Sequence, residues 1–261
     1  MIKEQILKAA KEIGLDKVGF TKNAVVALFP YFAADEPGNI SMYARGLDYH
    51  TVAEEKLKIL EKELCRLGAM ETRIHIDKGE LNDRDAAFSA GLGFYGQNGM
   101  LICEEYGSYF FIGQIVHNLD ITPDTPMGRE CLQCGRCERE CPGRALKGGE
   151  VDAEKCVSAI TQKRGELTID EARLIKKVGL CWGCDVCQRV CPHNRGLETT
   201  AMPEFMYDRV VGLAKCDLDG LSNKEFKEKY GKYAFSWRGK SVLARNLDIL
   251  SSALEESNEK K

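Results

Sequence analysis

The sequence lacks any uninterrupted apolar run approaching the roughly 18 residues that a helix needs to cross a bilayer. Residues 1–7 carry charges where a secretion signal would be apolar, and no Tat-type export signal is present. The formal net charge of -3 creates no general attraction to nucleic acid, so binding to tRNA would require a local basic patch. These absences predict a cytoplasmic protein that does not associate with membranes.

Cysteine, in contrast, is abundant, and nine of the twelve cysteines fall between residues 131 and 192. They form two copies of one motif, Cys131-x2-Cys134-x2-Cys137-x3-Cys141-Pro142 and Cys181-x2-Cys184-x2-Cys187-x3-Cys191-Pro192. Bacterial two-cluster ferredoxins use this spacing: three close thiolates bind one 4Fe-4S cubane, and the fourth binds the other. The pattern therefore predicts two 4Fe-4S clusters in preference to disulfides or structural zinc.

One ligand of the second cluster is not settled by the spacing. The motif assigns to the first cluster Cys131, Cys134, Cys137 and Cys191, and to the second Cys181, Cys184, Cys187 and Cys141. Cys156 lies between the motifs in a predicted helix and could replace Cys181. From the spacing, Cys156 and Cys181 remain rival ligands.

Strand and helix patterns alternate before residue 126, which predicts a mixed α/β fold of the α+β kind. Residues 2–13 have helical spacing with Gly14 as the stop, and a capping box of Thr51 and Glu54 predicts a helix that begins at Thr51. This second helix is expected to turn inward Leu57, Leu60, Leu64 and Cys65. The predicted strands are residues 17–21, 25–29, 72–77, 100–105 and 108–116.

Three segments are predicted along the chain: an α/β domain over residues 1–125, a ferredoxin-like two-cluster domain over 126–200, and a short helical tail over 201–261. Within the cluster domain, Thr168 and Glu171 form a capping box that starts a helix, and Gly179 is a plausible helix stop. In the tail, Ser222 and Glu225 start one more helix.

Several short motifs match a known family in order and spacing. They are Tyr43-Ala-Arg-Gly-Leu-Asp-Tyr-His50, Ile76-Asp77 with Asp83-Arg84, Ala90-Gly-Leu-Gly-Phe-Tyr-Gly-Gln-Asn98, Tyr106-Gly-Ser-Tyr-Phe-Phe-Ile-Gly113, Cys156-Val-Ser158, Gly183-Cys-Asp-Val-Cys-Gln188 and Cys191-Pro-His-Asn194. With them, the chain from residue 25 to about residue 250 resembles the epoxyqueuosine reductases, cobalamin-dependent enzymes that make the last reduction in queuosine synthesis on tRNA.

The resemblance implies a base-off cobalamin held between the N-terminal domain and the ferredoxin-like domain. Single electrons would pass through the cubanes to cobalt, and cob(I)alamin would reduce an epoxide or a related electrophilic carbon. The family pattern also uses the cysteine that matches Cys156 and has none at Cys181, so the resemblance favours Cys156 as the ligand. The residues expected to contact the corrinoid are Tyr43, Asp48, Tyr49, His50, Gly96, Gln97, Asn98, Ser108 and Ser158.

Asp77 is the catalytic candidate, because its match in the family is proposed as the proton donor beside cobalt. That role requires a carboxyl kept protonated near neutral pH by burial, whereas an ordinary aspartate at a strand end would be a helix cap or a solvated loop residue. Asp48-Tyr49-His50 nearly imitates the D-x-H-x-x-G cobalt-ligand motif, but Ala53 occupies its last glycine position. We therefore expect His50 to be a polar contact to the corrin amides or a core histidine, and cobalt ligation stays open as the alternative.

The chain also departs from the family pattern, with Lys78 and Glu80 after Asp77, and with Gln97 and His193 where lysine and tryptophan are usual. The resemblance stops where the family's tRNA-gripping helical repeats would begin, which argues against a complete tRNA platform. The basic residues of the tail, interleaved with acids, are predicted to form a solvated face. They are Lys224, Lys227, Lys229, Lys232, Arg238, Lys240 and Arg245.

The expected substrate is queuosine-related or another small molecule, and the expected electron donor is a ferredoxin or a flavodoxin-like protein. Two alternatives stay open from the sequence. One is an electron carrier without a corrinoid, although electron transfer alone would not need Asp77 or the glycine-rich turn of residues 91–99. The other is a reductive dehalogenase, a class that usually carries a Tat-type signal.

Overall fold

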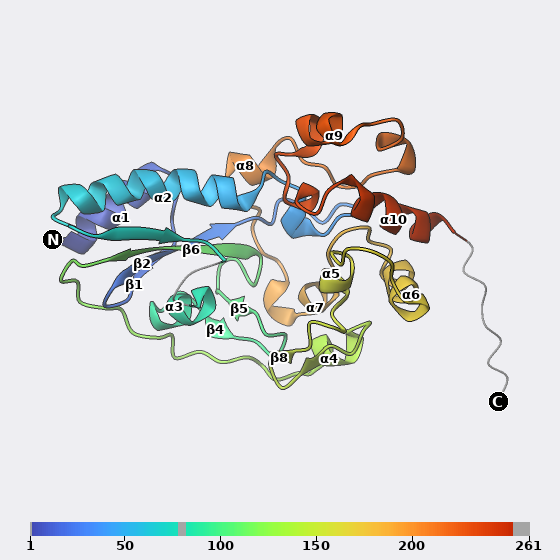
Figure 1. Ribbon diagram of the computed structural model, residues 1–261. Helices are drawn as coiled ribbons and strands as arrows, with labels where there is room; N and C mark the ends of the chain where they lie inside the picture. Colours follow the sequence, from blue (N-terminus) through green and yellow to red (C-terminus); the bar gives the residue numbers. More distant parts are fainter. Residues whose placement is uncertain (1, 78–81, 253–261) are drawn as a thin grey trace.

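The computed structural model describes residues 2–77 and 82–252. Its N-terminal half is built on a four-stranded antiparallel sheet with the strand order β1-β2-β6-β3 (Figure 1). The strands are β1 (Val18–Phe20), β2 (Ala24–Pro30), β3 (Thr72–His75) and β6 (Phe110–His117). The predicted mixed α/β class is confirmed, in its antiparallel α+β form.

Both faces of the sheet are covered, which explains the continuous apolar run of β2. Val25, Ala27 and Phe29 pack against α1 (Ile2–Glu12) and α2 (Tyr49–Arg66). Ala24, Val26 and Leu28 point the opposite way, because strand side chains alternate, and they pack against α3 (Asp83–Ser89). Figure 1 shows α1 and α2 on one side of the sheet and α3 on the other.

A short hairpin follows α3 and is more regular than the glycine-rich turn that the sequence predicts. It consists of β4 (Phe94–Tyr95) and β5 (Leu101–Ile102). Its tip is closed by two backbone hydrogen bonds, from Gly96 N to Met100 O at 2.8 Å and from Gly99 N to Gly96 O at 3.0 Å. Gly99 has φ 73°, a left-handed conformation that favours glycine.

The segment with the cysteine motifs contains short elements. They are α4 (Arg136–Glu140), β7 (Leu146–Lys147), β8 (Glu150–Val151), α5 (Val157–Ile160), α6 (Ile169–Val178) and α7 (Val186–Arg189). The capping box of Thr168 and Glu171 is present at the start of α6, and Gly179 ends that helix with φ 73°. Both predictions for this helix are therefore confirmed.

The tail adds the helices α8 (Pro203–Met206), α9 (Asn223–Tyr230) and α10 (Lys240–Ser251). Four 3-10 turns complete the described elements: η1 (Met42–Ala44), η2 (Pro192–Asn194), η3 (Lys215–Asp217) and η4 (Ala234–Ser236). The predicted start of α9 at Ser222 is confirmed by its capping box. Phe226, Phe235 and Leu243 pack into a second core with Ile40 and Trp182, so the tail rests on both earlier segments.

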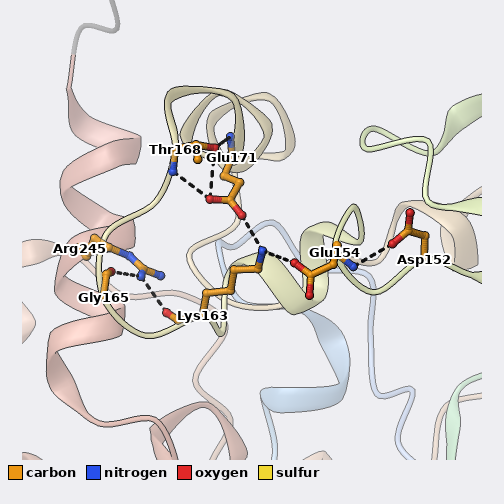
Figure 2. Close-up of polar contacts among 7 residues, drawn as sticks. All are labelled: Asp152, Glu154, Lys163, Gly165, Thr168, Glu171 and Arg245. Carbon is orange, nitrogen blue, oxygen red and sulfur yellow. Dashed lines mark hydrogen bonds and ion pairs between the residues drawn. The ribbon is translucent and has the colours of Figure 1, made fainter.

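Polar contacts hold the loop between α5 and α6 from two sides (Figure 2). Lys163 Nζ pairs with Glu154 at 2.9 Å and with Glu171 at 2.7 Å. From α10, Arg245 Nη1 donates to the carbonyl oxygens of Lys163 at 2.7 Å and Gly165 at 2.6 Å. Most of these contacts involve charged donors or acceptors, which form the stronger hydrogen bonds, so this loop has a defined path.

Two expectations for α2 are wrong. The helix begins at Tyr49 and not at Thr51, because the Asp48 carboxylate accepts from His50 N at 3.0 Å and caps the helix two residues earlier. Cys65 is exposed, whereas Leu57, Leu60 and Leu64 are buried as expected. The departures at Lys78 and Glu80 lie outside the described residues. No helix in the described ranges is both long and apolar enough to span a membrane.

Asn246 on α10 provides a test of how the tail is attached. Its fully buried amide donates to the carbonyl oxygens of Thr161 at 2.7 Å and Cys181 at 2.8 Å. We expect Asn246→Ala to lower the free energy of unfolding by about 1–3 kcal/mol, because it removes buried hydrogen bonds. The measurement is urea denaturation followed by circular dichroism.

The matched control is Asp248→Ala, two residues along the same helix, which removes an exposed pair with Lys215. This change should cost less than about 1 kcal/mol. Equal losses in the two variants would contradict the role assigned to Asn246.

Candidate functional site

Eight of the motif-region cysteines lie in two groups, each around its own cavity. The first group, Cys131, Cys134, Cys137 and Cys191, lines a small cavity against the tip of the β4–β5 hairpin. The second group, Cys141, Cys156, Cys184 and Cys187, lines a larger cavity. Cys181 belongs to neither group, because it is fully buried in the second core beside Trp182.

The electrostatics of the thiols agree with this grouping. Burial raises the pKa of Cys187, and the neighbouring thiolates of Cys184, Cys156 and Cys141 raise it further. Burial raises the pKa of Cys184 to about 11, again with contributions from Cys156 and Cys141. Burial and proximity thus disfavour the thiolate form in the free chain, and bound iron would supply the positive charge that four thiolates need.

All twelve cysteines are free of disulfide bonds. In the described part of the chain, no group of three or more histidine, cysteine or acidic side chains is arranged to hold a single metal ion. A cubane distributes its four thiolates over four irons, so its site needs no such group. The two cysteine groups thus have the donor set for cubanes.

The second cysteine motif is fastened to the N-terminal half by buried polar groups. Asp185 is 1% exposed and accepts from Ser41 Oγ and from Met42 N, the latter at 3.0 Å. Gly183 is required beside this contact, since a Cβ there would lie 2.3 Å from the Cβ of Ser41. Gln188 Nε2 donates to Ser108 O at 2.9 Å. The cysteines are therefore placed against the end of the sheet.

The larger cavity has a volume of about 340 Å³, within the usual range of small-molecule and cofactor sites. It lies between the second cysteine group and the N-terminal half, where β6 and the hairpin tip form the opposite wall. Of the predicted corrinoid contacts, four line it: Tyr43, Asn98, Ser108 and Ser158. Two further lining residues were not predicted as site residues: Tyr31, which follows the predicted strand of residues 25–29, and Gln188, which ends the motif that begins at Gly183.

A third cavity, of about 550 Å³ and without cysteines among its described lining residues, contains Asp77. Arg84, Phe110, Phe111 and Ile112 line both cavities, so the two adjoin along the start of β6. Gly96 and Gln97 lie elsewhere, at the first cysteine group. Gln97 Oε1 accepts from Gly135 N at 3.2 Å and so supports the turn between Cys134 and Cys137.

Asp77 is held in an unusual conformation by several contacts. Its φ is 59°, a left-handed value that typically costs about 1–3 kcal/mol outside glycine, though aspartate tolerates it better than most residues. Its backbone N–H donates to Asp83 Oδ2 at 2.7 Å, and Asp83 Oδ1 accepts from Gln114 Nε2 at 2.6 Å. The Tyr49 hydroxyl donates to the Asp77 carboxylate. These hydrogen bonds fix the position of Asp77 beside the start of β6.

His50 completes this group. Its Nδ1 lies 2.9 Å from Asp48 Oδ1 and its Nε2 lies 3.3 Å from Asp77 Oδ2. Hydrogen bonding to Asp48 and then to Asp77 raises the pKa of His50 to about 9. The imidazole is thus protonated at neutral pH and has no lone pair for a metal. The Asp-x-His spacing serves to cap α2 and to orient the imidazole.

The comparisons with known proteins agree with the sequence resemblance. Residues 130–194 match a family model described as a 4Fe-4S double cluster binding domain, and residues 19–78 match one described as epoxyqueuosine reductase QueG, DUF1730. The epoxyqueuosine reductase of Lactococcus garvieae is 34% identical in an alignment that covers 94% of this chain and 85% of that protein.

Solved structures show the same relationship. The epoxyqueuosine reductase of Streptococcus thermophilus is 32% identical with a TM-score of 0.86, over 95% of this chain and 80% of that one. An epoxyqueuosine reductase bound to an epoxyqueuosine-modified tRNA stem loop is 31% identical with a TM-score of 0.86 and the same coverage. A catabolic reductive dehalogenase shares only the fold, at 18% identity and a TM-score of 0.53, over 94% of this chain and 35% of that one.

The raised pKa of His50 makes a prediction about pH. Because the folded-state pKa of about 9 lies above the ordinary 6.5, His50 stabilises the fold below pH 6.5 and loses this contribution as pH rises through 9. We expect the difference in free energy of unfolding between the wild type and His50→Gln to shrink from pH 6 to pH 9.5. Urea titrations at intervals of pH measure it, and a constant difference would contradict the assignment.

Proposed function

This chain belongs to the epoxyqueuosine reductase family of oxidoreductases, and we propose that it binds two 4Fe-4S clusters and a base-off cobalamin and reduces the epoxide of a queuosine-type nucleoside in tRNA. The observation that carries the proposal is the pair of adjoining cavities. One is walled by the second cysteine group and the other contains Asp77, with Phe110–Ile112 shared between them. The proposed electron source and the proposed proton source would thus lie on either side of a shared wall.

The residues of the larger cavity fit a corrinoid. Its lining is mostly apolar, with the hydroxyls of Tyr43, Ser108 and Ser158 and the amide of Asn98 as polar groups for the macrocycle's side-chain amides. Both ring nitrogens of His50 face carboxylates, which agrees with a base-off state without a histidine ligand. A bound corrinoid supplies a cobalt centre that, when reduced, is a strong nucleophile toward electrophilic carbon.

The cluster ligands follow from the two cysteine groups. We propose that the first cluster is held by Cys131, Cys134, Cys137 and Cys191, and the second by Cys141, Cys156, Cys184 and Cys187. The second set lines the larger cavity, so its cluster would deliver electrons there. In the first set, Cys134 is exposed, as is the adjoining Leu132, so electrons would enter at that set from a ferredoxin or flavodoxin-like donor.

Asp77 and His50 would handle the proton. His50 keeps its proton at neutral pH, and its Nε2 lies 3.3 Å from Asp77 Oδ2, which allows transfer to the carboxylate. The Asp77 side chain is 49% exposed in the free chain. Substrate that covers it would exclude water and favour the neutral carboxyl, which can then protonate the oxygen released from the epoxide.

The alternatives fit the geometry less well. An electron carrier without a corrinoid would not need the larger cavity or the group of Asp77, Tyr49 and His50. For a reductive dehalogenase, only the fold supports the activity. The tRNA substrate is supported by a relative bound to a modified tRNA stem loop, and a tRNA substrate favours a location in the cytoplasm. We therefore retain the reductase proposal.

The proposal is tested with anaerobically reconstituted protein and cobalamin. We expect the wild type to produce a base-off cob(II)alamin EPR signal that free cofactor lacks, and to reduce an epoxyqueuosine-containing stem loop. Asp77→Asn should keep that signal and the cluster absorbance but lose turnover by about 10²- to 10⁴-fold, because a general acid is removed. An unchanged free-cofactor spectrum would leave the electron carrier, and retained turnover would remove Asp77 from the mechanism.

The ligand assignment has its own test, in which Cys156→Ser is compared with Cys181→Ser. We expect Cys156→Ser to lose up to about four of about eight irons per chain, because one cubane lacks a ligand. Cys181→Ser should keep the full iron content, since Cys181 lies in the second core. Iron analysis with sulfide determination measures both variants, and the reverse outcome would exchange the two roles.

A further inference from the structure

Trp237 lies at the end of η4 and is 55% exposed. Among the described residues it is the second most exposed aromatic residue, after Tyr207. The chain's other tryptophan, Trp182, is fully buried. The guanidinium carbon of Arg238 lies 3.6 Å from the centroid of the Trp237 ring and covers one part of it. The ring and the guanidinium stacked on it together present a flat π surface at an exposed position.

The ring is held in place by a relay of side chains that ends at the larger cavity. Trp237 Nε1 donates to Gln162 Oε1 at 3.2 Å. Gln162 Nε2 donates in turn to the Tyr43 hydroxyl at 3.2 Å and to Ser158 O at 3.0 Å. Tyr43 and Ser158 both line the larger cavity, so Trp237 is two hydrogen bonds away from its wall.

Gln162 itself is well placed for this relay. It lies in the loop after α5, whose neighbouring residues Lys163 and Gly165 are held by Arg245 from α10 (Figure 2). Lys163 is also paired with Glu154 and Glu171. Because this loop is restrained on both sides, the orientation of the indole is set before any ligand arrives.

Tyr43 is linked to Trp237 through Gln162, and it also feels the charge of Asp77. Burial raises the pKa of Tyr43, and the charge of Asp77 is among the further causes. Burial likewise raises the pKa of Tyr49, followed by the charge of Asp77, to which the Tyr49 hydroxyl donates. Tyr43 therefore lies within electrostatic reach of Asp77 while it contacts the side chain that orients Trp237.

We propose that Trp237, backed by Arg238, is a stacking platform for an unpaired RNA base next to the nucleotide that enters the cavity of Asp77; this rests on the proposed tRNA substrate. Single-stranded bases stack on aromatic rings and guanidinium planes, and the stack tolerates any base because each has a π face. The platform would hold the RNA strand while the neighbouring nucleotide reaches Asp77.

The test uses the reconstituted protein and an epoxyqueuosine-modified anticodon stem loop labelled for fluorescence anisotropy. We expect Trp237→Ala to weaken binding about tenfold, in the range of one base–aromatic stack, and Trp237→Phe to remain close to the wild type. The rise in KM for the stem loop should exceed any change in kcat. Tyr207→Ala is the matched control, because it removes an aromatic ring of 66% exposure, and its affinity should not change.

A series at position 237 separates stacking from a merely structural role. Trp237→Leu keeps apolar volume without a π face, so it should bind as weakly as the alanine variant, with cluster absorbance and melting temperature as wild type. Equal binding by the leucine and phenylalanine variants, or wild-type affinity in the alanine variant, would overturn the platform. If the wild type does not bind the stem loop but reduces the free nucleoside, the proposed tRNA substrate is wrong, and the platform is overturned with it.

Discussion

The joint between the second cysteine motif and the N-terminal half is the constraint on which the site depends. Asp185 stands between Cys184 and Cys187, almost fully buried, and accepts hydrogen bonds from Ser41 and Met42. A buried carboxylate is costly unless it is hydrogen-bonded, so this contact tolerates little displacement. With Gln188 bonded to Ser108, it sets the distance between the cysteine wall of the larger cavity and the start of β6, which also lines the cavity of Asp77.

The group around Asp77 shows why its residues belong together. Asp48 caps α2 and also holds the imidazole of His50, whose other nitrogen faces Asp77. Tyr49 stacks on Phe111 with ring centroids 4.0 Å apart, and its hydroxyl reaches the Asp77 carboxylate. One helix start thus provides an imidazolium, a hydroxyl and an orienting carboxylate to an aspartate in a left-handed conformation. The helix cap and the proposed proton chemistry use the same three consecutive residues.

Much of this arrangement is predictable from the sequence, because it depends on short-range patterns. The cysteine spacing, the α6 capping box and the Gly179 stop are local signals, and the structure contains the helix that they predict. The start of α2 was missed because Asp48 competes with Thr51 for the cap. The separation of Cys181 from the cysteine groups could not be derived from spacing, since it depends on how the tail packs around Trp182.

The tip of the β4–β5 hairpin lies between the first cysteine group and the larger cavity. Gly96, Gln97 and Asn98 face the first cysteine group, while Asn98, Gly99 and Met100 face the larger cavity. Asn98 Oδ1 accepts from Met100 N at 3.2 Å, and its buried Nδ2 has no hydrogen-bond partner in the part of the chain that the structure describes. One tight turn therefore forms a wall of both cavities, and its Asn98 amide presents that donor beside them, so a ligand bound on one side can change the position of a side chain that borders the other.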